Sequence, residues 1–490
     1  MWANRTRLLT RPRDVLPVNI RVMLIFSFIM AQTIAIIGAG VTGLGAAYRI
    51  RQESPDSRLL VFERDEMIGG MAKTLEWEGC RLDLGPHRFY TEIAGIEPFV
   101  RKLCSNCFVP VRRRSRMRLR NKLIRYPVSP LEVVNVLGVG SSFGIAWSSI
   151  RHLVSGKQSS VITYNDYICN RFGDRLYELL FGPYARKVWG CDPSDLEAET
   201  AIVRLRGDTI WQSLLDAVRG KGSSFVSTFL YPTGGIGQIS RNLAACLKES
   251  ELILNTGEVF PVVENGKCTG VRNRQGESWK TDTVLSTIPL PDLTRSVFDP
   301  ESSVCLSAKA LTFRGLVLLF LLYEKDLAIR DTWLYFPEPE IPFTRLSVPK
   351  NFHPDNVPSG KTVICLEFPC EPGDTIYQAG ESELRSIADE YLRRIGLADC
   401  SATAGLVVRL REGYPVYRVG YRSHFNSIIS ALKTIPNLIT AGRQGLFRHN
   451  NMDQAIQMGL IAGEQIVRSP NGSTEWYDGL SRFEGYRIVD

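Results

Sequence analysis

Residues 33–43 read TIAIIGAGVTG and predict a β-strand that runs through a glycine turn into a helix. The apolar, β-branched run at 33–37 is typical of a strand buried on both faces of a parallel sheet. The following residues, LGAAYRIRQ, carry a helical pattern with good helix formers. A second strand is expected in LLVFERD at 59–65, so the beginning of this region is interpreted as a βαβ unit.

Gly38, Gly40 and Gly43 match the pattern GxGxxG between a strand and a helix. Glycine lets the backbone turn tightly and approach a pyrophosphate, whose charge then lies at the helix N-terminus. Glu63 ends the second strand, close to the spacing expected for an acid that accepts a hydrogen bond from a ribose hydroxyl. The two signals together predict a nucleotide site, and a purely structural glycine turn is the alternative.

A second glycine-containing tract, RDEMIGGMAKT at 64–74, follows this acid. Gly69 and Gly70 offer backbone N–H groups to a further part of a long cofactor. Here the sequence resembles the FAD-dependent superfamily that includes amine oxidases, protoporphyrinogen oxidase and UDP-galactopyranose mutase. In that superfamily the same tract flanks the FAD pyrophosphate, which implies FAD as the cofactor and adds Arg64 and Met71 to its site. The resemblance runs in pieces from residue 33 to about 467.

Two further stretches extend the resemblance. DLGPHRFYT at 83–91 resembles the mutase loop GPHxFxT and a similar GPH of protoporphyrinogen oxidases, which implies that His87 lies beside the flavin ring. PYARKVWGCDPSDL at 183–196 is similar to a mutase stretch with KxWG, which implies that Trp189 lines the substrate pocket. Arg204 or Arg206 follows where that family keeps a substrate-contacting arginine.

The tract PFTRLSVPKNFHPDNVP at 342–358 also resembles one in eukaryotic mutases whose arginine grips a diphosphate. Arg345 is the matching residue, and a guanidinium fork suits phosphate oxygens. The structural alternative is that Arg204, Arg206 and Arg345 are salt-bridge partners, and that Trp189 is a plain core aromatic.

The stretch AGRQGLFRHNNMDQAIQMG at 441–459 resembles the mutase ending GRxGxYxYxxMD. The resemblance implies a flavin site that contains four residues of this stretch: Gly442, Arg443, Met452 and Asp453. A helix that starts near Asn451 would aim its dipole at the flavin carbonyls, where reduced flavin accumulates negative charge. Phe447 and His449 depart from the pattern, because the mutase has tyrosines there that hydrogen-bond the diphosphate.

Size and charge allow a multidomain enzyme. The chain has 490 residues, which predicts about three structural units. Its net charge of +8 mildly favours acidic partners such as phosphates. Eight basic residues and no acid occupy 112–125, where Arg116, Arg118 and Arg120 alternate with other residues. A strand with a solvated basic face is the favoured interpretation over a nucleic-acid or membrane patch.

The remaining composition gives no further cofactor. The eleven cysteines have no disulfide framework, and Cys104 and Cys107 form a lone CxxC without a second pair at zinc spacing, so no metal is expected. The apolar run VMLIFSFIM before the first strand is shorter than the ~20 residues of a membrane helix. We therefore expect a cytoplasmic enzyme without membrane or nucleic-acid partners; its oligomeric state is left open.

The predicted fold class is α/β, with a discontinuous Rossmann-like FAD-binding domain, a mixed-sheet substrate domain and a helical subdomain. Its expected divisions are an N-terminal extension at 1–30, an FAD-binding domain at 31–97, 223–300 and 405–470, a helical substrate subdomain at 98–222, a substrate-domain sheet at 301–404 and a tail at 471–490.

The predicted function is an FAD-dependent oxidoreductase, like amine or protoporphyrinogen oxidases, that takes a hydride from a small or nucleotide-linked substrate. The residues assigned to chemistry or substrate are His87, Trp189, Arg204 and Arg345. The alternative is a mutase-like isomerase of nucleotide sugars that uses reduced FAD. A flavin-binding scaffold without turnover is a third hypothesis, which the intact glycine loop disfavours.

Overall fold

The computed structural model describes residues 32–105, 107–126, 130–154, 161–205 and 227–488. One unit of the structure contains a five-stranded parallel sheet in the order β19-β13-β1-β2-β9. Its strands are β1 (Thr33–Ile37), β2 (Arg58–Phe62), β9 (Leu252–Ile253), β13 (Thr283–Ser286) and β19 (Leu438–Thr440). The sheet therefore collects strands from the start, the middle and the end of the chain, as the expected discontinuous domain requires.

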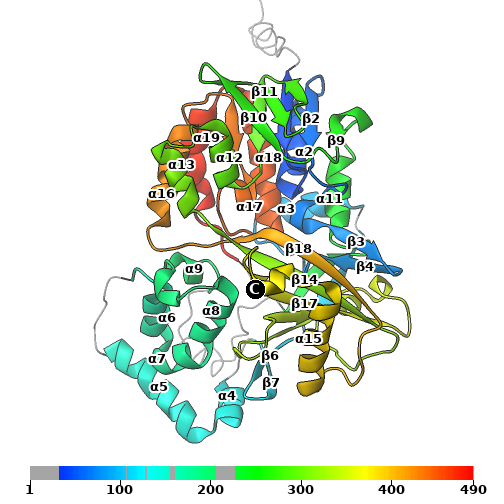
Figure 1. The fold of residues 1–490 in the computed structure, drawn as a ribbon, viewed down its shortest axis with the longest axis vertical. Coiled ribbons are helices and arrows are strands. Elements are labelled where there is room, and N and C mark those ends of the chain that lie inside the picture. The colour runs from blue at the N-terminus through cyan, green and yellow to red at the C-terminus, as the bar shows by residue number, and fades with distance from the viewer. Residues whose placement is uncertain (1–31, 106, 127–129, 155–160, 206–226, 489–490) are drawn as a thin grey trace, which may run out of the picture.

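Two helices pack closely against each other on this sheet. They are α2 (Val41–Glu53) and α18 (Met452–Arg468), near the top of Figure 1. A Cβ on Gly459 would lie 2.2 Å from the Thr42 carbonyl oxygen, and one on Gly463 would lie 2.6 Å from that of Ala46. Glycine at these positions thus lets the helix backbones touch, which fixes where α18 begins relative to the glycine turn.

Further elements surround the parallel sheet. The helices are α3 (Ile96–Leu103), α11 (Gly237–Ala244), α12 (Leu290–Val297), α13 (Ser303–Ala310), α16 (Tyr421–Leu432), α17 (Gly442–Gly445) and α19 (Ser473–Asp478). The strands are β3 (Thr74–Trp77), β4 (Cys80–Asp83), β5 (Phe108–Arg112), β8 (Thr228–Pro232), β10 (Val259–Glu264), β11 (Lys267–Asn273) and β12 (Ser278–Lys280). The last three form a meander whose turns contain Gly266 and Gly276, both with positive φ.

A seven-stranded mixed sheet forms the second unit, in the order β18-β14-β17-β16-β15-β6-β7. Its strands are β6 (Ser115–Leu119), β7 (Lys122–Arg125), β14 (Phe313–Tyr323), β15 (Trp333–Tyr335), β16 (Arg345–Ser347), β17 (Thr362–Cys370) and β18 (Ala404–Pro415). The helix α15 (Glu381–Arg394) buries Leu384, Ala388 and Leu392 in the core of this sheet. The predicted domain boundaries stay predictions. β6 and β18 pair with strands of the 301–404 segment, and β7 joins the same sheet through β6.

A helical lobe lies beside this sheet, at the lower left of Figure 1. Its main helices are α4 (Pro130–Leu137), α5 (Val139–Val154), α6 (Tyr164–Phe172), α7 (Asp174–Leu176), α8 (Gly182–Trp189) and α9 (Glu199–Ile202). The stretch TIWQSLLDAVR at 209–219 has an amphipathic helical pattern, and it lies outside the described residues. The lobe's α8 is tied to the sheet unit because the Lys187 ammonium donates to the backbone carbonyls of Phe336 and Glu338 at 2.7 and 3.1 Å.

The basic strand β6 is less solvated than the sequence predicted. Arg116 forms a bidentate ion pair with the buried carboxylate of Asp331, and Arg118 pairs with Glu338 at 2.9 Å. Both charges are therefore compensated by ion pairs, while Arg120 lies exposed in the turn that follows.

Two other sequence features can be checked on the described residues. All eleven cysteines are described, and each is free. None of the helices in the described ranges has the length and hydropathy of a membrane-spanning segment.

Candidate active site

A cavity of about 920 Å³ runs from the carboxyl ends of β1 and β2 to the edge of the seven-stranded sheet. One end is lined by the glycine turn and the acidic residues after β2. The other end is lined by side chains from the helical lobe, the mixed sheet and the N-terminus of α18. A ligand site at the carboxyl edge of a parallel sheet is the usual place in open α/β folds.

The glycine turn leaves room for the pyrophosphate of a dinucleotide cofactor. Gly38 has a φ of +103°, and a Cβ there would lie 2.3 Å from the Thr287 hydroxyl oxygen. A Cβ on Gly43 would lie 2.0 Å from the Gly38 carbonyl oxygen, so Gly43 packs the helix against the turn and does not line the cavity. Gly40 lines the cavity and begins α2 as its N-cap residue. The three glycines thus make an open approach to a helix N-terminus, which suits a pyrophosphate.

Glu63 lies at the end of β2, buried at one wall of the cavity. Its carboxylate accepts hydrogen bonds from the backbone N–H groups of Ala39 (3.1 Å) and Asp65 (3.3 Å). Burial raises the pKa of the Glu63 carboxyl, and the nearby Lys73 ammonium opposes that rise. The backbone therefore fixes the orientation of an acid that can accept from a sugar hydroxyl. Its neighbour Arg64 lines the same end but is largely exposed.

The second glycine tract closes over the first. Gly69 donates its N–H to the Ala39 carbonyl at 2.8 Å and has a left-handed φ of +111°. Gly70, with a φ of +56°, comes so close to Gly40 that a Cβ on it would lie 3.2 Å from the Gly40 Cα. Both glycines and Met71 line the cavity. The pair of tracts forms a cradle that side chains would fill.

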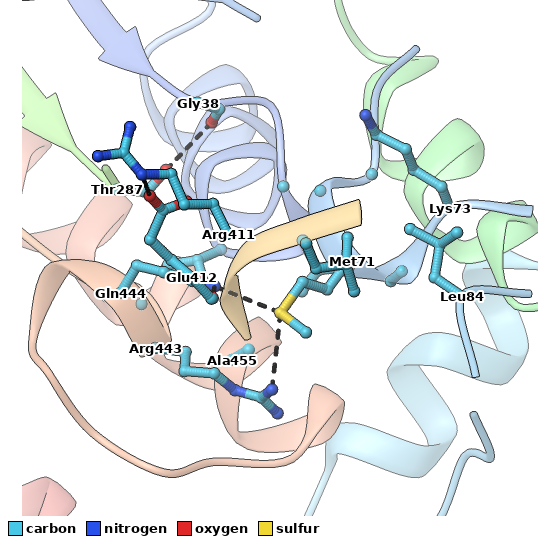
Figure 2. A pocket seen from close by; sticks show the side chains of 18 of the residues that line it. Gly38, Met71, Lys73, Leu84, Thr287, Arg411, Glu412, Arg443, Gln444 and Ala455 are labelled. Carbon is cyan, nitrogen blue, oxygen red and sulfur yellow. Dashed lines mark hydrogen bonds and ion pairs between the residues drawn. The ribbon is translucent and has the colours of Figure 1, made fainter. Parts of the chain in front are cut away.

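Met71 lies in the middle of the cavity, where the tract at 64–74 contacts the tract at 441–459. Figure 2 shows the Met71 sulfur facing Arg443 and Gln444, whose nitrogens lie 3.7 and 3.3 Å away. Arg443 also donates to the Asn450 carbonyl at 2.6 Å. Gly442, with a φ of +90°, begins this segment and lines the cavity. The structure thus brings together two tracts that lie far apart in the sequence.

The N-terminus of α18 also lies at the cavity wall. Asn451 is its N-cap residue and forms a reciprocal capping box with Gln454. Asn451 and Met452 line the cavity, whereas Asp453 is buried behind the wall, where burial raises the pKa of its carboxyl. The positive end of the helix dipole therefore points at the cavity from the place that the sequence predicted.

His87 lines the cavity as a neutral imidazole. Burial and the charges of Arg443 and Arg345 lower its pKa to about 4, although the backbone carbonyls of Leu84 and Met71 act in the other direction. At neutral pH His87 therefore contributes a hydrogen-bonding ring without charge.

Arg345 lines the cavity but already has an acidic partner. Its Nε and Nη2 donate to the two carboxylate oxygens of Glu367 at 2.7 and 2.9 Å, across the paired strands β16 and β17. Glu367 is buried and lines the cavity as well. The diphosphate-gripping fork expected from the resemblance is thus occupied by a carboxylate. Glu367 is not among the predicted site residues, because its only signal in the sequence is a lone charge in the apolar run TVICLEF.

Arg204 and Arg443 bring positive charge to the cavity wall. Neither guanidinium forms an ion pair with any residue that the structure describes. Burial and the charge of Arg204 lower the pKa of the Arg443 guanidinium. Arg204 instead packs on two aromatic rings, with its guanidinium carbon 4.9 Å from the Trp189 centroid and 5.4 Å from the Tyr414 centroid.

The aromatic wall around these arginines differs from the sequence expectation. Trp189 is buried and is absent from the cavity lining, because it packs behind Arg204 and against His449, 5.4 Å between ring centroids. Tyr414 and His449 line the cavity instead. Burial, Arg204 and Arg443 hold the pKa of the His449 imidazole well below its usual value. Phe447 is buried in the core, and Arg206 lies outside the described residues.

Comparisons with known proteins agree with this geometry. A model for NAD(P)-binding Rossmann-like domains matches residues 36–103, and a model for flavin containing amine oxidoreductases matches residues 141–467. Coproporphyrinogen III oxidase of Staphylococcus aureus is 22% identical, over 89% of this chain and 99% of its own length. Mitochondrial protoporphyrinogen oxidase of Nicotiana tabacum is 23% identical, over 89% of this chain and 95% of its own length.

A solved structure shows the same fold. The crystal structure of reduced UDP-galactopyranose mutase superposes with a TM-score of 0.80 at 21% identity, over 94% of this chain and 99% of that one. The predicted α/β class and the predicted superfamily are thus confirmed, and the glycine cradle fits FAD, the predicted cofactor. The chain belongs to the flavin-containing amine oxidoreductase family and is an FAD-dependent oxidoreductase.

Proposed function

We propose that this enzyme oxidises a small molecule that carries an acidic group, a carboxylate or a phosphate, next to the bond that loses hydride. The observation that carries the proposal is that two guanidiniums lining the cavity, Arg204 at the substrate end and Arg443 in the middle, have no acidic partner among the described residues. Arg204 and Arg443 are half-buried, and charge partly withdrawn from water without an acidic partner is costly, so an anionic ligand is the expected complement. Bound FAD supplies the chemistry by accepting the hydride.

The proposed roles follow the two ends of the cavity. At the nucleotide end, Gly38, Gly40, Gly69 and Gly70 hold the pyrophosphate and Glu63 accepts from the ribose, with Arg64 and Met71 beside them. In the middle, His87 and the Gly442–Arg443 segment hold the flavin ring, and the α18 N-terminus at Met452 favours its negative charge.

At the substrate end, Arg204 holds the acidic group of the substrate. His87 and His449 are both neutral, so they add hydrogen-bonding groups without further charge. This end of the cavity therefore orients the substrate carbon toward the flavin. It does not supply proton chemistry by a charged histidine.

The relatives support oxidation as the reaction class. The two relatives reported above are named oxidases of porphyrinogens, and this chain covers 95% or more of the length of each. The mutase is the second candidate, and the fold similarity favours it. Its diphosphate-binding groups are not matched here, because Arg345 is bound to Glu367, and Phe447 and His449 replace two tyrosines of the motif.

Anaerobic spectroscopy of the purified holoenzyme separates the two candidates. Oxidised enzyme is mixed with a panel of carboxylated amines and with coproporphyrinogen III, and loss of the oxidised flavin absorbance is followed. We expect one acidic substrate to bleach the flavin. In parallel, dithionite-reduced enzyme is incubated with UDP-galactopyranose. Conversion of this sugar without bleaching of oxidised flavin by any panel member would replace the oxidase proposal with the isomerase.

A further inference from the structure

Arg204 is held in the cavity wall by aromatic rings. Its guanidinium carbon lies 4.9 Å from the Trp189 ring centroid and 5.4 Å from that of Tyr414, and the two rings meet edge to face with centroids 6.2 Å apart. Guanidinium groups bind aromatic faces through the negative ring quadrupole, and this attraction grows as water is excluded. An aromatic partner holds the cation without neutralising its charge.

Aromatic partners differ from carboxylate partners in what they leave to a ligand. A carboxylate partner fixes Arg345 but also neutralises it. Tyr414 lies beside both Arg204 and Arg443, since the Arg443 guanidinium carbon is 5.9 Å from its centroid. Trp189 contacts Arg204 from the helical lobe, whereas Tyr414 comes from β18 of the mixed sheet. Two separate parts of the fold thus position one arginine while its charge stays available to a ligand.

We infer that Trp189 and Tyr414 are positioning residues that hold Arg204 in place for the acidic group of the substrate. This inference rests on the proposed function. It also reassigns Trp189, which the sequence placed in the substrate pocket, to a position behind Arg204, where it is 4% exposed. Tyr414, which sequence analysis did not single out, becomes part of the substrate site.

The test compares a charged and a neutral probe of the same shape. Benzoate and benzamide are titrated separately into oxidised holoenzyme, and binding is read from the perturbed flavin absorbance. We expect the wild type to bind benzoate more tightly than benzamide, and Arg204→Gln to lose this preference. Trp189→Leu is expected to weaken benzoate binding about tenfold with benzamide binding unchanged, whereas Trp189→Phe keeps most of the preference.

Several outcomes bear on the inference. If Trp189→Leu keeps the wild-type preference, or weakens both probes equally, Trp189 has only a packing role and the inference is wrong. Equal binding of both probes by the wild type would instead contradict the acidic-substrate proposal and the inference together. Tyr414→Phe and Tyr414→Leu repeat the comparison from the sheet side, in case Trp189→Leu fails to retain FAD. The double variant Trp189→Leu/Arg204→Gln should lose no more preference than Arg204→Gln alone.

Discussion

At the scale of single residues, Arg345 and Arg204 differ in their partners. Arg345 is paired with Glu367 and has a structural role, whereas Arg204 has no acidic partner among the described residues and is proposed to bind the substrate. A buried bidentate ion pair fixes both side chains, and loss of one partner leaves the other charge buried alone. Arg204, held by aromatic rings, keeps its charge for a ligand. The two arginines looked equivalent in the sequence because the identity of their partners depends on contacts between distant segments.

Arg345→Ala is therefore expected to lower the stability of the protein. Glu367 would stay buried without its cation, and removal of one partner of a buried pair costs on the order of 3–5 kcal/mol. The thermal midpoint of the apoprotein measures the effect. The double variant Arg345→Ala/Glu367→Leu, which removes both charges, should recover most of the loss. A single variant as stable as the wild type would show that the pair does not hold the site together.

His87 gives a prediction about pH. Its pKa is about 4 in the folded protein, below the ordinary value of 6.5. Between these values the unfolded chain binds a proton that the folded chain does not, so the contribution of His87 to stability is present above pH 6.5 and is lost as the pH falls toward 4.

We expect His87→Gln to make the apoprotein less sensitive to acid. The fall in thermal midpoint between pH 7 and pH 5 should be smaller in the variant than in the wild type, by roughly 1–3 °C. Comparing each protein with itself at the two pH values removes the general effect of the substitution. An unchanged fall would mean that the folded His87 titrates normally.

At the scale of elements, the turn between β1 and α2 depends on the absence of side chains. A Cβ on Gly43 would lie 2.0 Å from the Gly38 carbonyl oxygen and 3.1 Å from a methyl group of Ile36. The Gly38 peptide would have to shift, and with it the approach to the pyrophosphate.

Gly43→Ala is thus expected to purify with less FAD than the wild type, because displacement of the turn weakens FAD binding, about tenfold for each ~1.4 kcal/mol of lost binding free energy. Gly140→Ala in α5 is the matched control, because a Cβ there meets no atom within 4 Å. It should keep full FAD content. Normal flavin in both variants would contradict the close packing at Gly43.

The sequence predicted those elements whose signals are local. The strand, glycine turn and helix at 33–53, and the start of α18 beside Asn451, follow from neighbouring residues, and the structure confirms both. The sheet to which a strand belongs is not a local property. Residues 405–415 belong to the predicted FAD-binding segment 405–470, and β18 pairs with β14 of the mixed sheet. The residue pattern of β18 does not indicate which strand it pairs with.

At the scale of the whole molecule, the cavity gathers residues from every unit. Gly38 comes from the parallel sheet region, Arg204 from the helical lobe, Glu367 and Tyr414 from the mixed sheet, and Arg443 from the C-terminal segment. Motif matches identified the separate contributors Gly38, Arg204 and Arg443. They could not identify Glu367 or Tyr414, or show that Trp189 lies behind Arg204, because these depend on how the units pack.

The central feature of the proposed function is an acidic substrate group held by Arg204 beside the FAD site. The most direct test is the rate of anaerobic flavin reduction by carboxylated amines and coproporphyrinogen III, each compared with its methyl ester, in the wild type and in Arg204→Gln. We predict that an acid that reduces the flavin does so at least about tenfold faster than its ester, and that Arg204→Gln removes this difference. An ester that reduces the wild-type flavin as fast as its acid would contradict the account.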